Sequence, residues 1–81
     1  MTFIDIGFGN YAAAERILTV ASPETAPIKR LVQEAKDDGR AVDVSCGQKT
    51  RAVLITDSDL ILLSALTPEA LSEQLNGGER A

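Results

Sequence analysis

Two apolar runs in the second half of the chain constrain its fold most. Val53–Ile55 and Leu60–Leu66 are apolar on both faces of any strand that they form. Antiparallel sheets of soluble monomers usually keep one face polar and in water. One main helix and a short second helix cannot cover both faces of such a sheet. We therefore expect a second subunit to cover the remainder.

One main helix is predicted in the first half of the chain. Its apolar side chains recur with the helical spacing i, i+3, i+4 and i+7, at Ile28, Leu31, Val32 and Ala35. Pro27 is tolerated only in a first helical turn, so the helix should begin near Thr25 or Ala26. Gly39 is a typical C-cap residue and should mark its end.

The other elements are expected to be short. Strands are predicted at Phe3–Ile6, Arg16–Ala21, Ala41–Cys46, Ala52–Thr56 and Leu60–Leu66. Tyr11–Glu15 stays open between helix and strand, because Ala-Ala-Ala-Glu favours helix by propensity. Thr67 as N-cap and Pro68 as the first helical residue predict a short C-terminal helix.

Clusters of Gly, Asn, Asp and Ser predict the turns, at Gly7–Asn10, Gly47–Thr50 and Asp57–Asp59. Val42, Val44 and Cys46 continue one period-two alternation, so Cys46 is interpreted as a small hydrophobic residue at the end of a strand. Gly47–Thr50 would then form the tip of a hairpin that leads into the next strand.

Length and composition bound the kind of protein. With 81 residues the chain forms one domain, which we assign to residues 1–75, followed by a flexible acidic tail at residues 76–81. We identify no signal peptide and no apolar stretch long enough for a transmembrane helix. A single cysteine cannot form an internal disulfide. A cytoplasmic protein is expected.

The composition argues against an enzyme. The chain has no histidine, the commonest general base. Asp57 and Asp59 could act as an acid pair, but Asp-Ser-Asp between apolar runs is more typical of a turn whose side chains bond the backbone. Gly7–Ala12 fits the pattern G-x-G-x-x-A, yet no clear βαβ unit follows it, which favours a tight turn over a dinucleotide site. We expect no catalytic residue, no metal and no cofactor.

Charge is unevenly distributed along the chain. Residues 57–81 contain five acids and one cation, so they carry the whole net charge of −4. The cations Lys29, Arg30 and Lys36 share the predicted helix with acids, which is typical of a solvated face or of ion pairs between subunits. The acids are Glu34, Asp37 and Asp38. The remaining set, Arg16, Lys49 and Arg51, is compatible with an anion-binding face or with ordinary surface charge.

A family resemblance bears on this choice. The segments IDIGFGN, ASPETAPIKRLVQEAKDDGR and TRAVLITDSD, in this order and spacing, closely resemble the RemA-like family of bacterial regulators of extracellular matrix genes. The resemblance extends from about Thr2 to Leu75. It implies an α+β fold: a small antiparallel sheet, packed with one main helix and a short C-terminal helix, related to LytTR-type DNA-binding domains.

The resemblance also implies a function. It predicts a closed homo-oligomeric ring, heptameric or octameric, that binds double-stranded DNA and regulates transcription of matrix (biofilm) genes. The DNA-binding positions would be Arg16, Gln48, Lys49 and Arg51. Where the family commonly has Gly-Arg-Arg-Thr-Arg, this chain has Gly-Gln-Lys-Thr-Arg, so Gln48 and Lys49 replace two arginines. The alternative is a ring-forming scaffold or protein-interaction module with weak or no DNA binding.

Overall fold

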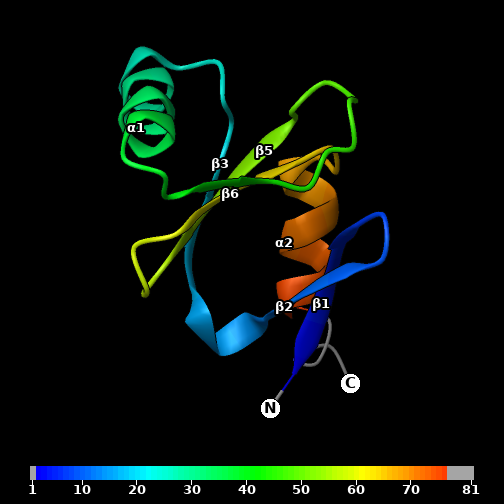
Figure 1. Ribbon diagram of the computed structural model, residues 1–81. Helices are drawn as coiled ribbons and strands as arrows, with labels where there is room; N and C mark the ends of the chain where they lie inside the picture. Colours follow the sequence, from blue (N-terminus) through cyan, green and yellow to red (C-terminus); the bar gives the residue numbers. More distant parts are fainter. Residues whose placement is uncertain (1, 77–81) are drawn as a thin grey trace.

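The computed structural model describes residues 2–76, and its strands form two separate sheets (Figure 1). In chain order the elements are β1 (Phe3–Gly7), β2 (Asn10–Ala13), the 3-10 helix η1 (Ala14–Arg16), β3 (Ile17–Ala21), α1 (Ala26–Asp37), β4 (Ala41–Asp43), β5 (Ala52–Thr56), β6 (Ile61–Ser64) and α2 (Pro68–Asn76). The predicted α+β class is confirmed. No helix within residues 2–76 has the length and apolar character needed to cross a bilayer.

The larger sheet has the strand order β3-β5-β6-β4. β5 pairs antiparallel with β3 and β6, whereas β4 pairs parallel with β6. The prediction of a purely antiparallel sheet is therefore wrong for this pair. β6, which is apolar on both faces, takes the interior position between β5 and β4. β4 takes the edge, where exposed Val42 and Asp43 reach water.

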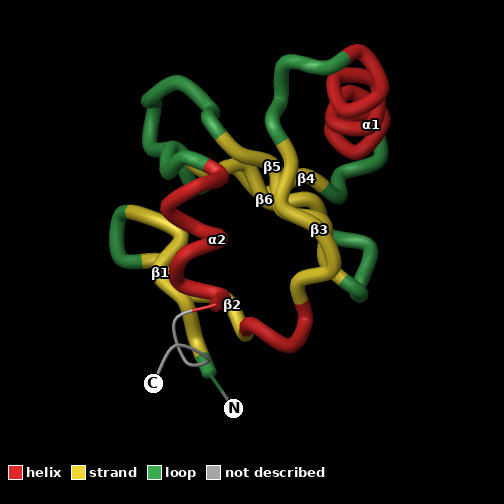
Figure 2. Tube along the Cα trace, turned by 180° about the vertical axis from the view of Figure 1, so that it is seen from behind, coloured by secondary structure: helices red, strands yellow, loops and turns green. Residues whose placement is uncertain are grey.

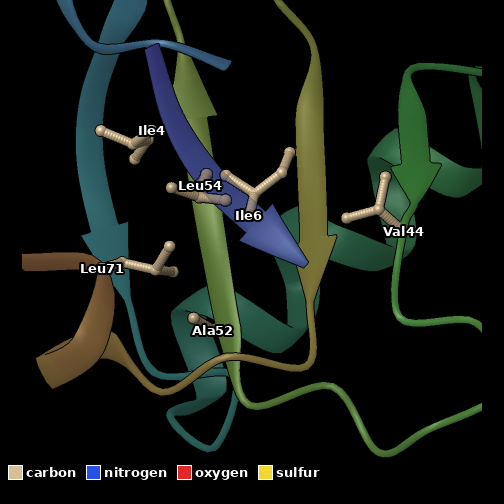
Figure 3. Packing of buried hydrophobic residues seen from close by; sticks show 6 residues of the cluster. All are labelled: Ile4, Ile6, Val44, Ala52, Leu54 and Leu71. Carbon is tan, nitrogen blue, oxygen red and sulfur yellow. The ribbon is translucent and has the colours of Figure 1, made fainter. Parts of the chain in front are cut away.

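The two faces of the larger sheet are covered by different parts of the same chain. On one face, the β1–β2 hairpin and α2 close a core formed by Ile4, Ile6, Val44, Ala52, Leu54 and Leu71 (Figure 3). On the other face, Ala35 of α1 packs with Val53, Ile61 and Leu63. Seen from behind, α2 lies against the hairpin and α1 lies apart from both (Figure 2). The strand faces that we expected a second subunit to cover are thus buried within one chain.

The helix boundaries agree with the predicted caps. α1 begins at Ala26, as predicted; Thr25 precedes it, with no capping hydrogen bond from its side chain, and Gly39, with φ of +73°, follows the C-terminal end. In α2 the Thr67 hydroxyl accepts a hydrogen bond of 3.1 Å from the Ala70 backbone N–H, as expected of an N-cap. α2 continues to Asn76, the first residue of the predicted tail, and residues 77–81 lie outside the described part of the chain.

The N-terminal turn is as predicted. Gly7, Phe8 and Gly9 have positive φ angles of 112°, 54° and 80°, and they join β1 to β2 in an antiparallel hairpin. The ambiguous segment Tyr11–Glu15 divides between β2 and η1. Arg16 is the last residue of η1, so the strand that was expected to begin there begins at Ile17.

The Asp57–Asp59 segment forms the predicted turn between β5 and β6, but another side chain fixes it. The Thr56 hydroxyl donates to the Leu60 carbonyl at 2.9 Å and accepts from the Leu60 N–H at 3.2 Å. The carboxylate of Asp57 instead faces Arg16. The predicted turn is therefore confirmed. The expectation of hydrogen bonds from the aspartate side chains to the backbone is wrong, because Thr56 makes the turn's bonds instead.

Cys46 differs from its sequence interpretation. β4 ends at Asp43, and Cys46 is an exposed loop residue with φ of +52°. The cause lies in the Asp43 carboxylate, which accepts hydrogen bonds from both the N–H and the hydroxyl of Ser45. These bonds turn the chain directly after the strand and bury Ser45, so the period-two alternation does not reach Cys46.

Candidate nucleic-acid interface

The candidate residues Gln48, Lys49 and Arg51 lie on the loop between β4 and β5. Because β6 separates these two strands, the loop is an arch over the end of β6, not the tip of a hairpin. At its start, the Val44 N–H donates to the Leu63 carbonyl at 2.9 Å, and at its end the Arg51 N–H donates to the Ser64 carbonyl at 2.8 Å. We call residues 44–51 the β6 arch. Both of its ends are fixed to the same central strand.

Within the arch, the chain turns tightly before the candidate residues. The Gln48 N–H donates to the Ser45 carbonyl at 3.0 Å, and Gly47 adopts a positive φ of 82°. This turn follows directly on the hydrogen bonds between Asp43 and Ser45. They lower the pKa of the Asp43 carboxyl, an effect to which nearby Lys36 adds and which slight burial opposes. The arch is thus held by its own polar contacts as well as by β6.

The side chains of Gln48, Lys49 and Arg51 are exposed and available to a ligand. Within residues 2–76, none of the three forms a side-chain hydrogen bond or an ion pair. Lys49 and Arg51 also line a hollow of about 150 Å³, together with Ser22, Pro23, Glu24, Thr50, Thr67 and Pro68. We call it the loop hollow. Glu24 is the acidic side chain in its wall, so the hollow carries an excess of positive charge.

Arg16 lies away from the other candidate residues. Its carbonyl accepts a hydrogen bond of 2.9 Å from the Asp57 N–H, which places it beside the end of β5. Arg51 precedes the start of the same strand. At the rise of an extended chain, six residues separate the two ends by roughly 20 Å. The structure therefore brings Gln48, Lys49 and Arg51 together and leaves Arg16 at the opposite end.

Arg16 also has a partner that the sequence did not predict. Its guanidinium lies 3.5 Å from the Asp57 carboxylate, and the two side chains are 65% and 38% exposed. An exposed pair of this kind contributes about 0–1 kcal/mol, so it competes only weakly with another anion. No local sequence pattern signals this pair, because it depends on the pairing of β3 with β5, which sets Ile17 opposite Thr56.

Within residues 2–76, no group of three or more Cys, Asp or Glu side chains is arranged to hold a metal ion. The two buried polar residues of the described chain, Ser45 and Ser64, both donate hydrogen bonds from their hydroxyls. Fold and loop together define a small α+β protein that presents cationic side chains on an anchored arch.

The chain belongs to the RemA-like family. Residues 3–75 match the family described as "Extracellular matrix regulatory protein A-like". The chain is 49% identical over 79 residues to a protein of Geobacillus thermodenitrificans, and the match covers 98% of this chain and 91% of that protein. It is 52% identical over 77 residues to a protein of Halothermothrix orenii, covering 95% and 92%. Both carry the name "Putative regulatory protein". Family and names together support a regulatory role.

Proposed function

We propose that this protein binds double-stranded DNA and regulates transcription, in line with the matrix-regulator description of its family. The observation that carries the proposal is the β6 arch. It is anchored at both ends and presents the cations Lys49 and Arg51, with Gln48, free of partners within residues 2–76. Cations held in this way can neutralise phosphates and release the counterions condensed on DNA. Shape and deformability of the duplex would then contribute more to recognition than base edges.

Arg16 fits the proposal if the duplex runs along β5. Phosphates of one strand follow each other every 3.4 Å along the helix axis, so a span of roughly 20 Å covers about six base pairs. One duplex segment could then contact the arch at one end of β5 and Arg16 at the other. To do so it must replace Asp57 as the partner of Arg16.

Self-association is part of the proposal, and its support lies on the β1–β2 hairpin. All three aromatic residues of the chain are on this hairpin, and Phe3, Phe8 and Tyr11 are 60%, 57% and 65% exposed. Phe3 and Tyr11 share its outer face, because Asp5 pairs with Tyr11 and Phe3 with Ala13. Exposed apolar groups gathered in this way are typical of interaction surfaces. We propose that a second copy covers them, in a closed homo-oligomeric ring of the kind that the resemblance implies.

A ring would compensate for the small number of cations on each subunit. Repetition of the arch around a closed assembly turns weak single contacts into a multivalent surface. The competing function is a ring-forming scaffold with weak or no DNA binding. Two observations favour it: Gln48 is neutral where the family commonly has arginine, and the charge of Arg16 is offset by Asp57.

The two functions differ in their response to salt. Fluorescence anisotropy with a labelled duplex, titrated at several salt concentrations, should show that log affinity falls steeply with log salt. Lys49→Ala should flatten this plot by about 0.9 for each engaged subunit. Arg30→Ala, which removes a cation from exposed α1, should change the plot less. Weak binding that responds equally to both variants would overturn the DNA-binding proposal in favour of the scaffold.

A further inference from the structure

A second hollow adjoins the loop hollow on the side of α1. It has a volume of about 280 Å³, and Lys29, Val32 and Lys36 of α1 line it; we call it the helix hollow. Pro23 and Thr50 line both hollows, so the two are neighbours at one end of the larger sheet. Figures 1 and 2 show α1 and the β6 arch on either side of the β3–α1 connection at this end.

The cations of α1 do not form one group in the structure. Lys29, Gln33 and Lys36 follow the spacing i, i+4 and i+7, which places them on one side of the helix, and all three line the helix hollow. Arg30 lines neither hollow. From the sequence, these cations were interpreted together, as a solvated face or as ion pairs between subunits. The structure instead separates Lys29 and Lys36, beside the arch, from Arg30.

The lysines of the chain are concentrated here. The sequence contains three, Lys29, Lys36 and Lys49, and all of them line one of the two adjoining hollows. Arg51 brings the cations around the hollows to four. The acids near them include Glu24, in the wall of the loop hollow, and Asp37, which accepts a hydrogen bond of 3.1 Å from Gln33 of the helix hollow. Asp43 is close enough to Lys36 to be influenced by its charge. Within residues 2–76, no ion pair neutralises any of the four cations.

We infer that the DNA-contacting surface extends from the β6 arch onto α1, with Lys29 and Lys36 as additional phosphate contacts. The inference rests on the proposed function. Two cationic rims with a hollow between them fit a ridge of negative charge, and the sugar–phosphate strand of a duplex is such a ridge. Of the valine and leucine residues that line the helix hollow, Val53 and Leu63 are buried, so only half-buried Val32 is available to the hydrocarbon of the sugars.

Amine footprinting of the wild-type protein tests this inference without any substitution. The protein is treated with an amine-reactive reagent, with and without saturating duplex DNA, and modification of each lysine is measured by mass spectrometry. We expect DNA to protect Lys29, Lys36 and Lys49 together. Protection of Lys49 alone would overturn the inference and leave the proposed function standing. Protection of none of the three would contradict both.

Charge-matched variants provide a second measurement. Lys29→Ala and Lys36→Ala should each lower affinity by about eightfold at about 0.1 M salt for every phosphate that is no longer neutralised, and should flatten the salt plot. Arg30→Ala removes the same charge from the same helix and should have a smaller effect. If both lysine variants match Arg30→Ala while Lys49→Ala still weakens binding, the extension onto α1 is wrong and the arch remains the site.

These variants should remain folded, because alanine is a better helix former than lysine and both positions are exposed. Circular dichroism and light scattering check the fold and the assembly mass. Where an alanine variant changes the mass, Lys29→Gln or Lys36→Gln replaces it and keeps most of the side-chain length. A glutamine variant with wild-type mass and wild-type salt dependence would then overturn the inference.

Discussion

The Arg16 Nη1 atom lies 3.5 Å from the Asp57 Oδ1 atom, across the ends of β3 and β5. The pair is exposed, so it adds little to stability, and the carboxylate competes weakly with any other anion for the guanidinium. Any phosphate that binds Arg16 must first displace this carboxylate. Asp57 is therefore expected to limit DNA affinity.

Replacement of Asp57 by asparagine should release Arg16 and tighten DNA binding. The Asp57 backbone N–H, which bonds the Arg16 carbonyl, is retained, so the strand end should keep its geometry. Asp59→Asn is the matched control, because it removes the same charge from the same turn without touching Arg16. Anisotropy titrations should show a larger gain in DNA affinity for Asp57→Asn than for Asp59→Asn. Equal gains would mean that only net charge matters and that Arg16 does not contact DNA.

Gln48→Arg restores the arginine that the family commonly has in the arch. It adds an exposed cation beside Lys49 and should tighten binding, with a salt plot steeper by about 0.9 for each engaged subunit. Ser72→Arg, at an exposed position of α2, provides the same added charge elsewhere. If Gln48→Arg leaves both affinity and slope unchanged in assemblies of wild-type mass, the arch does not face phosphate.

Assembly should depend on the aromatic side chains of the β1–β2 hairpin. The double substitution Phe3→Ser and Tyr11→Ser removes exposed apolar groups without opening a buried cavity, so the fold should persist while the assembly weakens. Light scattering behind a sizing column should report a lower mass than for the wild type. Val42→Thr, on the edge strand β4, should keep the wild-type mass. A wild-type protein that is folded at 8.6 kDa would contradict the proposal of self-association.

Ser45→Ala should weaken the turn that begins the β6 arch. Loss of the hydroxyl donor to Asp43 should lower the free energy of unfolding by about 1 kcal/mol at neutral pH. Ser72→Ala, at an exposed position of α2, should have little effect. Urea denaturation followed by circular dichroism measures both. An unchanged midpoint for Ser45→Ala would show that the backbone N–H alone holds the Asp43 carboxylate.

The hydrogen bonds between Ser45 and the Asp43 carboxylate also predict that the free energy of unfolding depends on pH. Hydrogen bonds from Ser45 hold the pKa of Asp43 below its ordinary value, so the stabilisation is complete above that value. It is lost as the pH falls below about 4, through the lowered pKa of the folded protein. Denaturation of the wild type should therefore show this loss, and Ser45→Ala should show less of it. Equal losses would exclude Asp43 as the titrating group.

Cys46 should tolerate residues that accept a left-handed backbone. At φ of +52° a side chain is strained, and asparagine and glycine relieve that strain. Cys46→Asn should leave the unfolding free energy unchanged or raise it by up to about 1 kcal/mol. Cys46→Val, which is β-branched, should lower it. A loss in Cys46→Asn as large as in Cys46→Val would indicate that the thiol itself contributes to packing.

Local chemistry made part of this structure predictable. The start of α1 near Pro27, the N-cap at Thr67, the helical period of α1 and the glycine turn after β1 depend on neighbours within a few residues, and each agrees with the structure. The period-two pattern failed at Cys46 because a side chain bonded to the backbone ended β4 early. A hydrogen bond of that kind leaves no mark in the hydrophobic pattern.

Contacts between distant segments were not predictable in the same way. The parallel pairing of β4 with β6 and the ion pair between Arg16 and Asp57 follow from strand order, which the spacing of residues does not encode. For the candidate site, the resemblance supplied Gln48, Lys49 and Arg51. The sequence placed Lys29 and Lys36 on the helix with Arg30, and only the fold, which sets α1 beside the arch, separates them from Arg30.

The interior place of β6 has a consequence for the order of folding. β6 is the last strand in the chain, yet it lies between β5 and β4, so the sheet stays incomplete until residues 61–64 insert. The two amides that anchor the arch, of Val44 and Arg51, both donate to β6. A nascent or truncated chain without this strand cannot shape the arch. Fluctuations that detach β6 should expose both amides to hydrogen exchange in one step, so the arch should exist only as long as the whole sheet does.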